Sequence, residues 1–179
     1  MVQKTLVLIK PDAMDRGLAG EVISRFEKAG FKLADLKMVQ VERSLSEKHY
    51  HLDDENYLRS IGQKGLDAGD KIDDLVEQGR MIISANCDFI ISRPIIAMIL
   101  EGNDAVAEVR KIVGYTDPAK AEKGTIRGDL GTDNILDANR EKRPVLNLVH
   151  ASGTPEEAEA EIKLWFNEAG SSQSKAPLG

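Results

Sequence analysis

The sequence predicts an α+β domain in which four antiparallel strands, in the order βαββαβ, are backed by helices. Short apolar runs of strand length alternate with segments that have helical spacing. The 179 residues are enough for one domain with a full hydrophobic core, and 41% apolar with 30% charged residues is ordinary for a globular protein. A split βαβ sandwich is the simplest arrangement of these elements.

The first third of the chain supplies two strands with a helix between them. An apolar run predicts a strand over residues 5–9, which Lys10-Pro11-Asp12 ends. Helical spacing of apolar residues predicts a helix over residues 18–29, with Gly30 as its stop. Residues 31–41 then have the pattern of a second strand.

The middle of the chain is predicted to be mostly helical, with an insertion. Ser46 is expected to cap a helix over residues 46–59. Residues 62–79 are polar and contain four glycines that indicate turns around a short helix at 71–77, so we expect a surface insertion. Residues 81–91 are apolar enough for a buried helix, although their isoleucines leave a strand possible.

After this helix, residues 95–100 have the pattern of a firm strand. Asn103 or Asp104 is expected to cap the next helix, which carries four apolar residues on one side and ends at Gly114.

The rest of the chain is predicted to be a long loop, a strand, a helix and a tail. Residues 115–144 have almost no apolar periodicity, and a stretch of this length is usually functional or disordered. A strand is expected over residues 145–149, and Thr154 then caps an acidic helix. We expect one domain over residues 1–169 and a flexible tail over 170–179.

His150 is the first candidate for chemistry because it follows the last predicted strand, where sites on α/β sheets gather. In the acidic helix that follows, Glu161 falls inside the apolar arc, and a carboxylate turned toward the core needs a partner. A carboxylate that accepts a hydrogen bond from one imidazole nitrogen leaves the other nitrogen free as a nucleophile. The alternative is that His150 is only a structural histidine in a turn.

Four further residues offer the cations, hydroxyl group and freed backbone N–H groups that a polyphosphate clamp needs. Lys10 follows the first strand, and Arg110 and Thr116 lie near the end of the 104–113 helix. Arg127 lies in the loop GTIRGD, which is neither a Walker motif nor a dinucleotide-binding fingerprint. Each residue taken alone could instead be an exposed charge or turn residue.

Four other polar or aromatic residues have weaker signals. Tyr50 is expected to be half-buried packing, and Asn147 either caps a turn or bonds ribose hydroxyls. His49 and His51 flank Tyr50 on adjacent helix positions and face different directions, so we interpret both as surface residues that form no paired metal site.

Composition excludes several other classes of protein. The formal net charge of −6 argues against nucleic-acid binding as the main task. The five-residue apolar stretch near the N-terminus is too short for a signal peptide, and no run approaches the ~20 apolar residues of a membrane span. With Cys87 as the only cysteine, no intramolecular disulfide can form, which fits a cytoplasmic location.

With these motifs in order, the chain resembles the nucleoside diphosphate kinases. The resemblance covers segments 5–31, 93–102, 109–129 and 147–166, which include the lysine-proline-aspartate, GTIRGD and histidine motifs. It implies a ferredoxin-like fold and a homo-oligomer, either a hexamer or a tetramer of dimers. It also implies transfer of the γ-phosphoryl group of ATP to a nucleoside diphosphate through a phosphohistidine, with Mg²⁺ held mainly by the nucleotide phosphates.

The resemblance implies a role for each candidate residue. It makes His150 the phosphorylated residue and Glu161 its orienting carboxylate, with Tyr50 beside the histidine and Lys10 on the ribose and the moving phosphate. The remaining nucleotide contacts that it implies are Arg110, Arg127 and Thr116 on the phosphates, Asn147 on the ribose, and Ile82 near the base.

Three departures from the family pattern stand out. Ala151-Ser152-Gly153 lacks the aspartate of the common glycine-serine-aspartate turn. Residues 56–80 and 131–143 are expected to be longer-loop insertions, and Ile82 is aliphatic where an aromatic residue usually stacks on the base.

Two alternatives from other classes remain. A non-catalytic interaction module would have lost clamp residues, whereas every clamp position keeps the family's residue type. An RNA-binding sheet would need exposed aromatic residues on its strands, but only 4% of the chain is aromatic.

Overall fold

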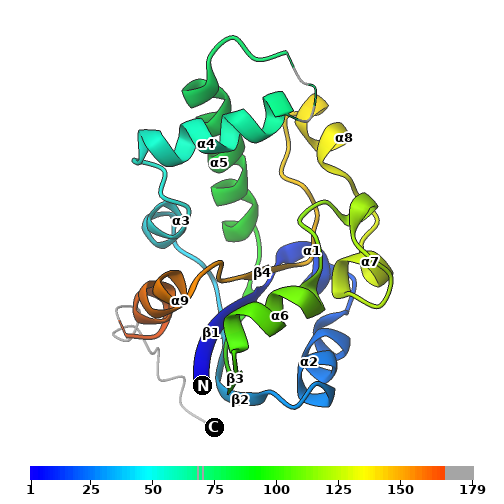
Figure 1. Ribbon diagram of the computed structural model, residues 1–179. Helices are drawn as coiled ribbons and strands as arrows, with labels where there is room; N and C mark the ends of the chain where they lie inside the picture. The colour runs from blue at the N-terminus through cyan, green and yellow to red at the C-terminus, as the bar shows by residue number, and fades with distance from the viewer. Residues whose placement is uncertain (68, 70, 168–179) are drawn as a thin grey trace, which may run out of the picture.

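The computed structural model describes residues 1–67, 69 and 71–167. Its centre is a four-stranded sheet in the order β2-β3-β1-β4, with every pair antiparallel (Figure 1). The strands are β1 (Val2–Ile9), β2 (Lys32–Val39), β3 (Ile95–Asn103) and β4 (Val149–Ala151). The predicted four-stranded antiparallel sandwich is therefore confirmed.

The helices are arranged around this sheet. They are α1 (Pro11–Asp15), α2 (Ala19–Lys28), α3 (Arg43–His49), α4 (Glu55–Asp67), α5 (Leu75–Ile91), α6 (Ala105–Val113), the short η1 (Pro118–Lys120), α7 (Ile126–Leu130), α8 (Ile135–Arg140), α9 (Pro155–Ile162) and the π-helical turn η2 (Lys163–Asn167). No described helix is long and apolar enough to cross a lipid bilayer.

Strand β1 is buried on both faces, which explains its continuous apolar run. Val7 and Ile9 belong to a core that includes residues of α2 and α6. Leu6 and Leu8 belong to a second core, on the opposite face, that contains Ile90 and Trp165. Alternate residues of a strand point to opposite faces, so helices on both sides of the sheet require apolar residues at successive positions.

Helices α4 and α5 form a hairpin at the end of the molecule opposite the N-terminus (Figure 1). The turns predicted at Gly62 and Gly79 are wrong, because both glycines lie inside these helices. A Cβ at Gly62 would lie 2.1 Å from the Leu75 carbonyl oxygen, and one at Gly79 would lie 1.9 Å from that of Leu58. The glycines therefore let the two helix backbones touch.

The predicted helix over residues 46–59 is broken into two. Helix α3 ends at His49, and His51 adopts a positive φ of 49° before α4 begins. Ser46 is not a cap but is buried inside α3, where its hydroxyl donates to the Arg43 carbonyl oxygen. The Asp54 side chain instead accepts from the first backbone N–H groups of α4.

The last third also differs from the prediction. The expected loop over 115–144 contains η1, α7 and α8, so it has short helices of its own. The strand expected over 145–149 forms later, as β4, and His150 lies within it rather than after it. Thr154 caps α9 as predicted, with its hydroxyl accepting from the Glu157 N–H. The predicted tail lies outside the described residues.

Candidate active site

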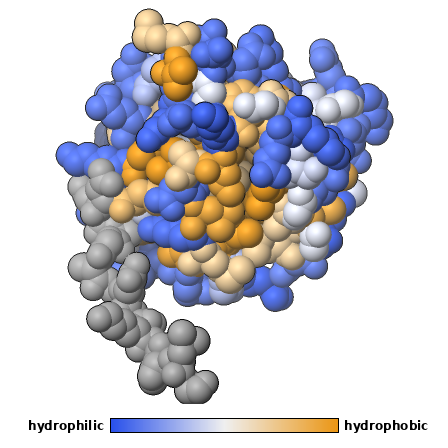
Figure 2. Space-filling model, turned by 90° about the horizontal axis from the view of Figure 1, so that it is seen from below, coloured by the Kyte–Doolittle hydropathy of each residue, from blue (hydrophilic) through white to orange (hydrophobic). Residues whose placement is uncertain are grey.

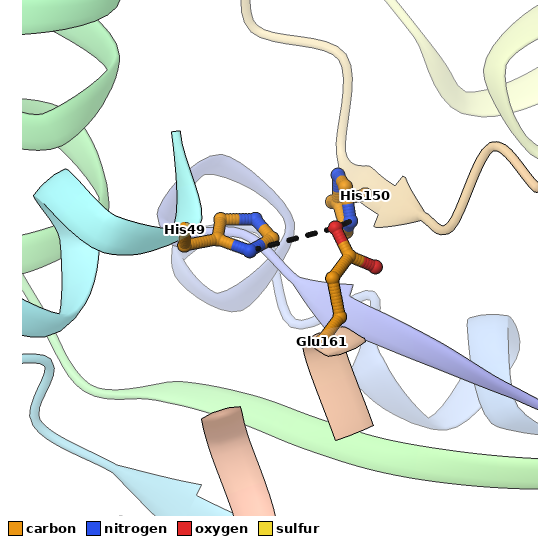
Figure 3. A group of neighbouring side chains, drawn as sticks. All are labelled: His49, His150 and Glu161. Atoms are coloured by element: carbon orange, nitrogen blue, oxygen red, sulfur yellow. Dashed lines mark hydrogen bonds and ion pairs between the residues drawn. The ribbon is translucent and has the colours of Figure 1, made fainter. Parts of the chain in front are cut away.

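His150 and Glu161 meet where β4 and α9 converge (Figure 3). The Nε2 atom of His150 lies 2.9 Å from Oε1 of Glu161, and the second carboxylate oxygen accepts from the Ser152 hydroxyl at 2.6 Å. The side chains of His150 and Glu161 are 24% and 12% exposed, so the ring keeps access to solvent while the carboxylate is largely covered. Glu161 therefore faces the interior, as the helical pattern of the sequence predicted.

This contact determines the chemical state of the imidazole. Burial alone would raise the pKa of Glu161, but the hydrogen bonds from His150 and Ser152 and the neighbouring His49 and His150 lower it to about 2. The carboxylate is therefore ionised and accepts the Nε2 proton, which leaves the lone pair on Nδ1 of His150. A neutral histidine in this tautomer is a nucleophile.

His49 is not a surface residue, and that prediction is wrong. It is 4% exposed, and its Nδ1 accepts a hydrogen bond from the Trp165 indole over 3.2 Å. Its ring lies edge-on to that of His150, with the ring centroids 4.5 Å apart. Burial and the neighbouring His150 lower the pKa of His49 to about 3, so its 3.6 Å approach to Glu161 is not an ion pair. No residue spacing signalled this burial.

A second group of polar residues meets at the end of β1. Lys10 is 5% exposed, and its ammonium group donates to the side-chain oxygen of Asn147 at 2.9 Å. The amide nitrogen of Asn147 in turn donates to the backbone oxygen of Thr116. The structure therefore joins three predicted site residues, although Lys10 and Asn147 are 137 residues apart in the sequence. Burial lowers the pKa of Lys10 to about 8, against the charge of Asp12, which raises it.

Arg127 binds the backbone that leads to His150. Its guanidinium group donates to the carbonyl oxygens of Asn147, Val149 and Gly114 at 3.0, 2.7 and 3.0 Å. Burial and the neighbouring Arg110 lower the pKa of Arg127 to about 10, which still leaves it charged at neutral pH. Arg110 itself is exposed, and a groove of about 890 Å³ that it lines runs between α6 and the start of α9.

Tyr50 directly follows α3, and Ile82 lies on α5. The Tyr50 ring packs edge-on against His49 at 4.7 Å, and burial raises its pKa well above the usual range. Ile82 is half-buried on α5, so its contact with a base stays a prediction. Phe89, on the same helix, lies under the Lys10 ammonium group at 5.3 Å from the ring centroid and was not predicted.

Metal binding by the protein itself is a possibility only at His49, His150 and Glu161, among the described residues. Their donor atoms lie within 4.8 Å of one another. Two imidazoles and one carboxylate are a poor set for Mg²⁺, which prefers oxygen ligands in octahedral geometry. The nitrogen of His49 that faces the carboxylate is also engaged by Trp165.

A covered carboxylate, an oriented imidazole and converging cations on an antiparallel βαββαβ sheet are the features of a phosphotransferase site. The family model of the nucleoside diphosphate kinases matches residues 3–60 and 76–170. The chain belongs to the nucleoside diphosphate kinase family, whose members bind nucleotides, need a divalent metal ion and transfer phosphoryl groups between nucleotides.

Similar proteins with known names agree with this assignment. The nucleoside diphosphate kinase of Pyrobaculum aerophilum is 50% identical over 177 residues, which cover 93% of this chain and 96% of that one. A crystal structure of an NDP kinase from the same organism has a TM-score of 0.89 at 47% identity, and covers 94% of this chain and 98% of its own.

A solved structure with ligands is also similar. It is a transition-state mimic of nucleoside-diphosphate kinase from Borrelia burgdorferi with bound vanadate and ADP. It has a TM-score of 0.77 at 33% identity, and the match covers 94% of this chain and 89% of that one.

Proposed function

We propose that His150 is the residue that carries the phosphoryl group between nucleotides in a ping-pong cycle. The observation that carries this proposal is the 2.9 Å contact of Nε2 with Glu161, because it directs the Nδ1 lone pair away from the carboxylate. Nδ1 attacks the γ-phosphorus of ATP, the bond to the bridging oxygen breaks, and ADP leaves. The terminal oxygen of a second nucleoside diphosphate then takes the phosphoryl group from Nδ1 and restores the free imidazole.

The cations around His150 would stabilise the charge on the transferring group. Lys10, Arg110 and Arg127 are the cations, and the Thr116 hydroxyl is an additional donor. Arg127 spends three of its N–H groups on carbonyl oxygens, so two of its five remain for phosphate. Mg²⁺ would enter on the nucleotide phosphates as part of the substrate, which suits a site whose own donors do not fit that ion.

The ribose and the base of the nucleotide would bind to residues around the Lys10–Asn147 pair. Lys10 and Asn147 form a polar edge suited to ribose hydroxyl groups, and Tyr50 lines the same site beside His49. Ile82 would offer an aliphatic face to the base, which selects for a planar ring but not for one particular base. Several nucleoside di- and triphosphates would therefore be substrates.

We also propose that the protein is a homo-oligomer, a hexamer or a tetramer built from dimers. Strand β2 is an edge strand, and its Leu33, Leu36 and Met38 are 38%, 40% and 65% exposed. Figure 2, seen from the end at which Figure 1 labels β2 and β3, has a broad hydrophobic area with hydrophilic borders. An exposed apolar edge strand is a template for pairing with a second copy. Met38→Glu is expected to lower the mass measured by light scattering.

A cytoplasmic location is proposed on the chemistry of Cys87, which is free and buried. A protein without a disulfide, acting on nucleoside triphosphates, suits a reducing compartment rich in these substrates.

Labelling with radioactive ATP and Mg²⁺ tests the mechanism. The parent protein should gain an acid-labile phosphate on His150, and adding a nucleoside diphosphate should move the label into a triphosphate. His150→Gln should abolish both steps, while His51→Gln, a change at an exposed histidine, should leave both intact. Labelling of the His150→Gln variant at the parental rate would refute the phosphohistidine mechanism.

A further inference from the structure

The backbone immediately before His150 is held in an unusual conformation. Leu148 has a φ of +70° although it carries a side chain and is fully buried. The Val149 N–H donates to the carbonyl oxygen of Asn147 over 2.8 Å, which closes a three-residue γ-turn around Leu148. Turns of this hand are rare and strained, and such strain persists only where surrounding groups impose it.

Three residues from two other segments of the chain hold this turn. Arg127 donates to the carbonyl oxygens of Asn147 and Val149 on either side of Leu148. The Lys10 N–H donates to the Leu148 carbonyl oxygen at 2.8 Å. The one remaining polar group of the turn residue, the Leu148 N–H, donates to Oδ2 of Asp12 at 2.9 Å.

Asp12 makes this contact from a helix at the start of the chain. It follows Pro11 in the five-residue helix α1, and it is 7% exposed. Its second oxygen, Oδ1, is buried and has no hydrogen-bond partner among the described residues. A buried carboxylate whose acceptor capacity is only partly used costs stability.

We propose that Asp12 is a positioning residue for phosphoryl transfer: its carboxylate fixes the Leu148 turn and, through it, the place of the His150 ring and the Asn147 side chain. The inference rests on the proposed role of His150. Asn147 is the first residue of the turn and His150 follows its last residue, so relaxation of Leu148 toward a negative φ would move both. Asp12 acts through the backbone N–H of Leu148, which is why its effect is one of position.

The charge of Asp12 has a second consequence that agrees with this role. It raises the pKa of Lys10 and that of Arg127, the two cations closest to the turn. A single anion between two buried cations keeps both charged beside the nucleophile.

Single-turnover phosphorylation of His150 by saturating labelled MgATP tests the proposal, with the folded state checked by denaturant unfolding. Asp12→Ala is expected to lower the saturating rate on the order of 100-fold, as small displacements of reacting groups do. The MgATP concentration for half-maximal rate should rise by a smaller factor than the saturating rate falls, because the displaced Asn147 weakens ribose binding whereas the displaced His150 slows the transfer itself. Asp12→Asn keeps an oxygen that can accept from Leu148, so its rate should fall between the two.

Asp74→Ala is the matched control. Asp74 also accepts from backbone N–H groups, those of Val76 and Glu77 at the start of α5, but lies outside the site. It should lose stability without losing rate.

The outcomes separate the two proposals. If the parent protein gains no label on His150, the phosphohistidine mechanism fails. If the parent is labelled and Asp12→Ala reacts at the parental rate, or loses rate only through a matching rise in half-saturating MgATP, the positioning role of Asp12 fails. If Asp12→Ala does not fold, Asp12→Asn decides alone, and a parental rate there overturns the role.

Discussion

The Lys10 ammonium group donates to the side-chain oxygen of Asn147 across 137 residues of chain. This bond joins the end of β1 to the segment that precedes the nucleophile. It also holds a cation where burial opposes its charge, so the proton on Lys10 is weakly bound compared with that of an exposed lysine.

The first prediction concerns the alkaline side of the pH profile. Because the pKa of Lys10 is about 8, its positive charge is lost as pH rises through that value, and the rate of phosphoryl transfer should fall there. Arg127 and His49 also lie in this region, but their pKa values are about 10 and about 3, away from this pH range. Lys10→Arg should move the fall above about pH 10 because arginine keeps its proton. An unmoved alkaline limb, measured as kcat/KM against pH, would contradict this assignment.

The second prediction concerns Glu161 and acid stability. Its folded pKa is lowered to about 2 from 4.5, so it stabilises the fold above pH 4.5 and loses this effect as pH falls toward 2. The loss should be on the order of 3 kcal/mol. Glu161→Gln should flatten the stability curve in this window, measured by urea unfolding. It should also slow phosphorylation about tenfold, because a neutral amide orients the imidazole less well.

The third prediction concerns His49, which affects stability over a different pH range from Glu161. Its folded pKa is about 3 against 6.5 for an exposed histidine, so stability should fall as pH drops from 6.5 toward 3. His49→Gln removes this titration while keeping an acceptor for the Trp165 indole, so stability should depend less steeply on pH between 6.5 and 4.5, above the range in which Glu161 acts. His51→Gln, at an exposed neighbour whose charge also lowers the pKa of His49, should change this pH dependence less.

The fourth prediction concerns the α4–α5 hairpin. Gly79→Ala places a methyl group against the Leu58 carbonyl oxygen, so the helices must separate, at a cost of about 1–3 kcal/mol or more. Gly20→Ala in α2 is the matched control, because no atom lies within 4 Å of its added Cβ. It should stabilise by up to about 1 kcal/mol through helix propensity. Equal effects in thermal unfolding would show that the close contact is unimportant.

Much of the fold followed from periodicity alone. Thr154 capped α9 as its side chain and the following Pro155 predicted, and the apolar arc of that helix placed Glu161 toward the sheet. These features depend on residues close together in sequence, where spacing determines which side chains share a face.

Other features could not be predicted because the decisive contact is remote. Gly62 and Gly79 are ordinary turn signals until a second helix backbone lies against them. Leu148 has no preference for a positive φ, so the pattern of residues 145–149 predicted a strand where Asp12 and Arg127 impose a turn. His49 is buried beside Trp165, 116 residues later, whose indole N–H donates a hydrogen bond to its Nδ1.

The Leu148 turn also bears on how the protein is made. Its ties come from α1 near the start of the chain and from α7 in the last third, while the carboxylate partner of His150 arrives only with α9. A nascent chain released before that helix would have most of its sheet but no carboxylate to orient the imidazole. Enzymatic activity therefore reports that synthesis has passed α9, and chains that end before this helix should transfer phosphate more slowly than the whole protein.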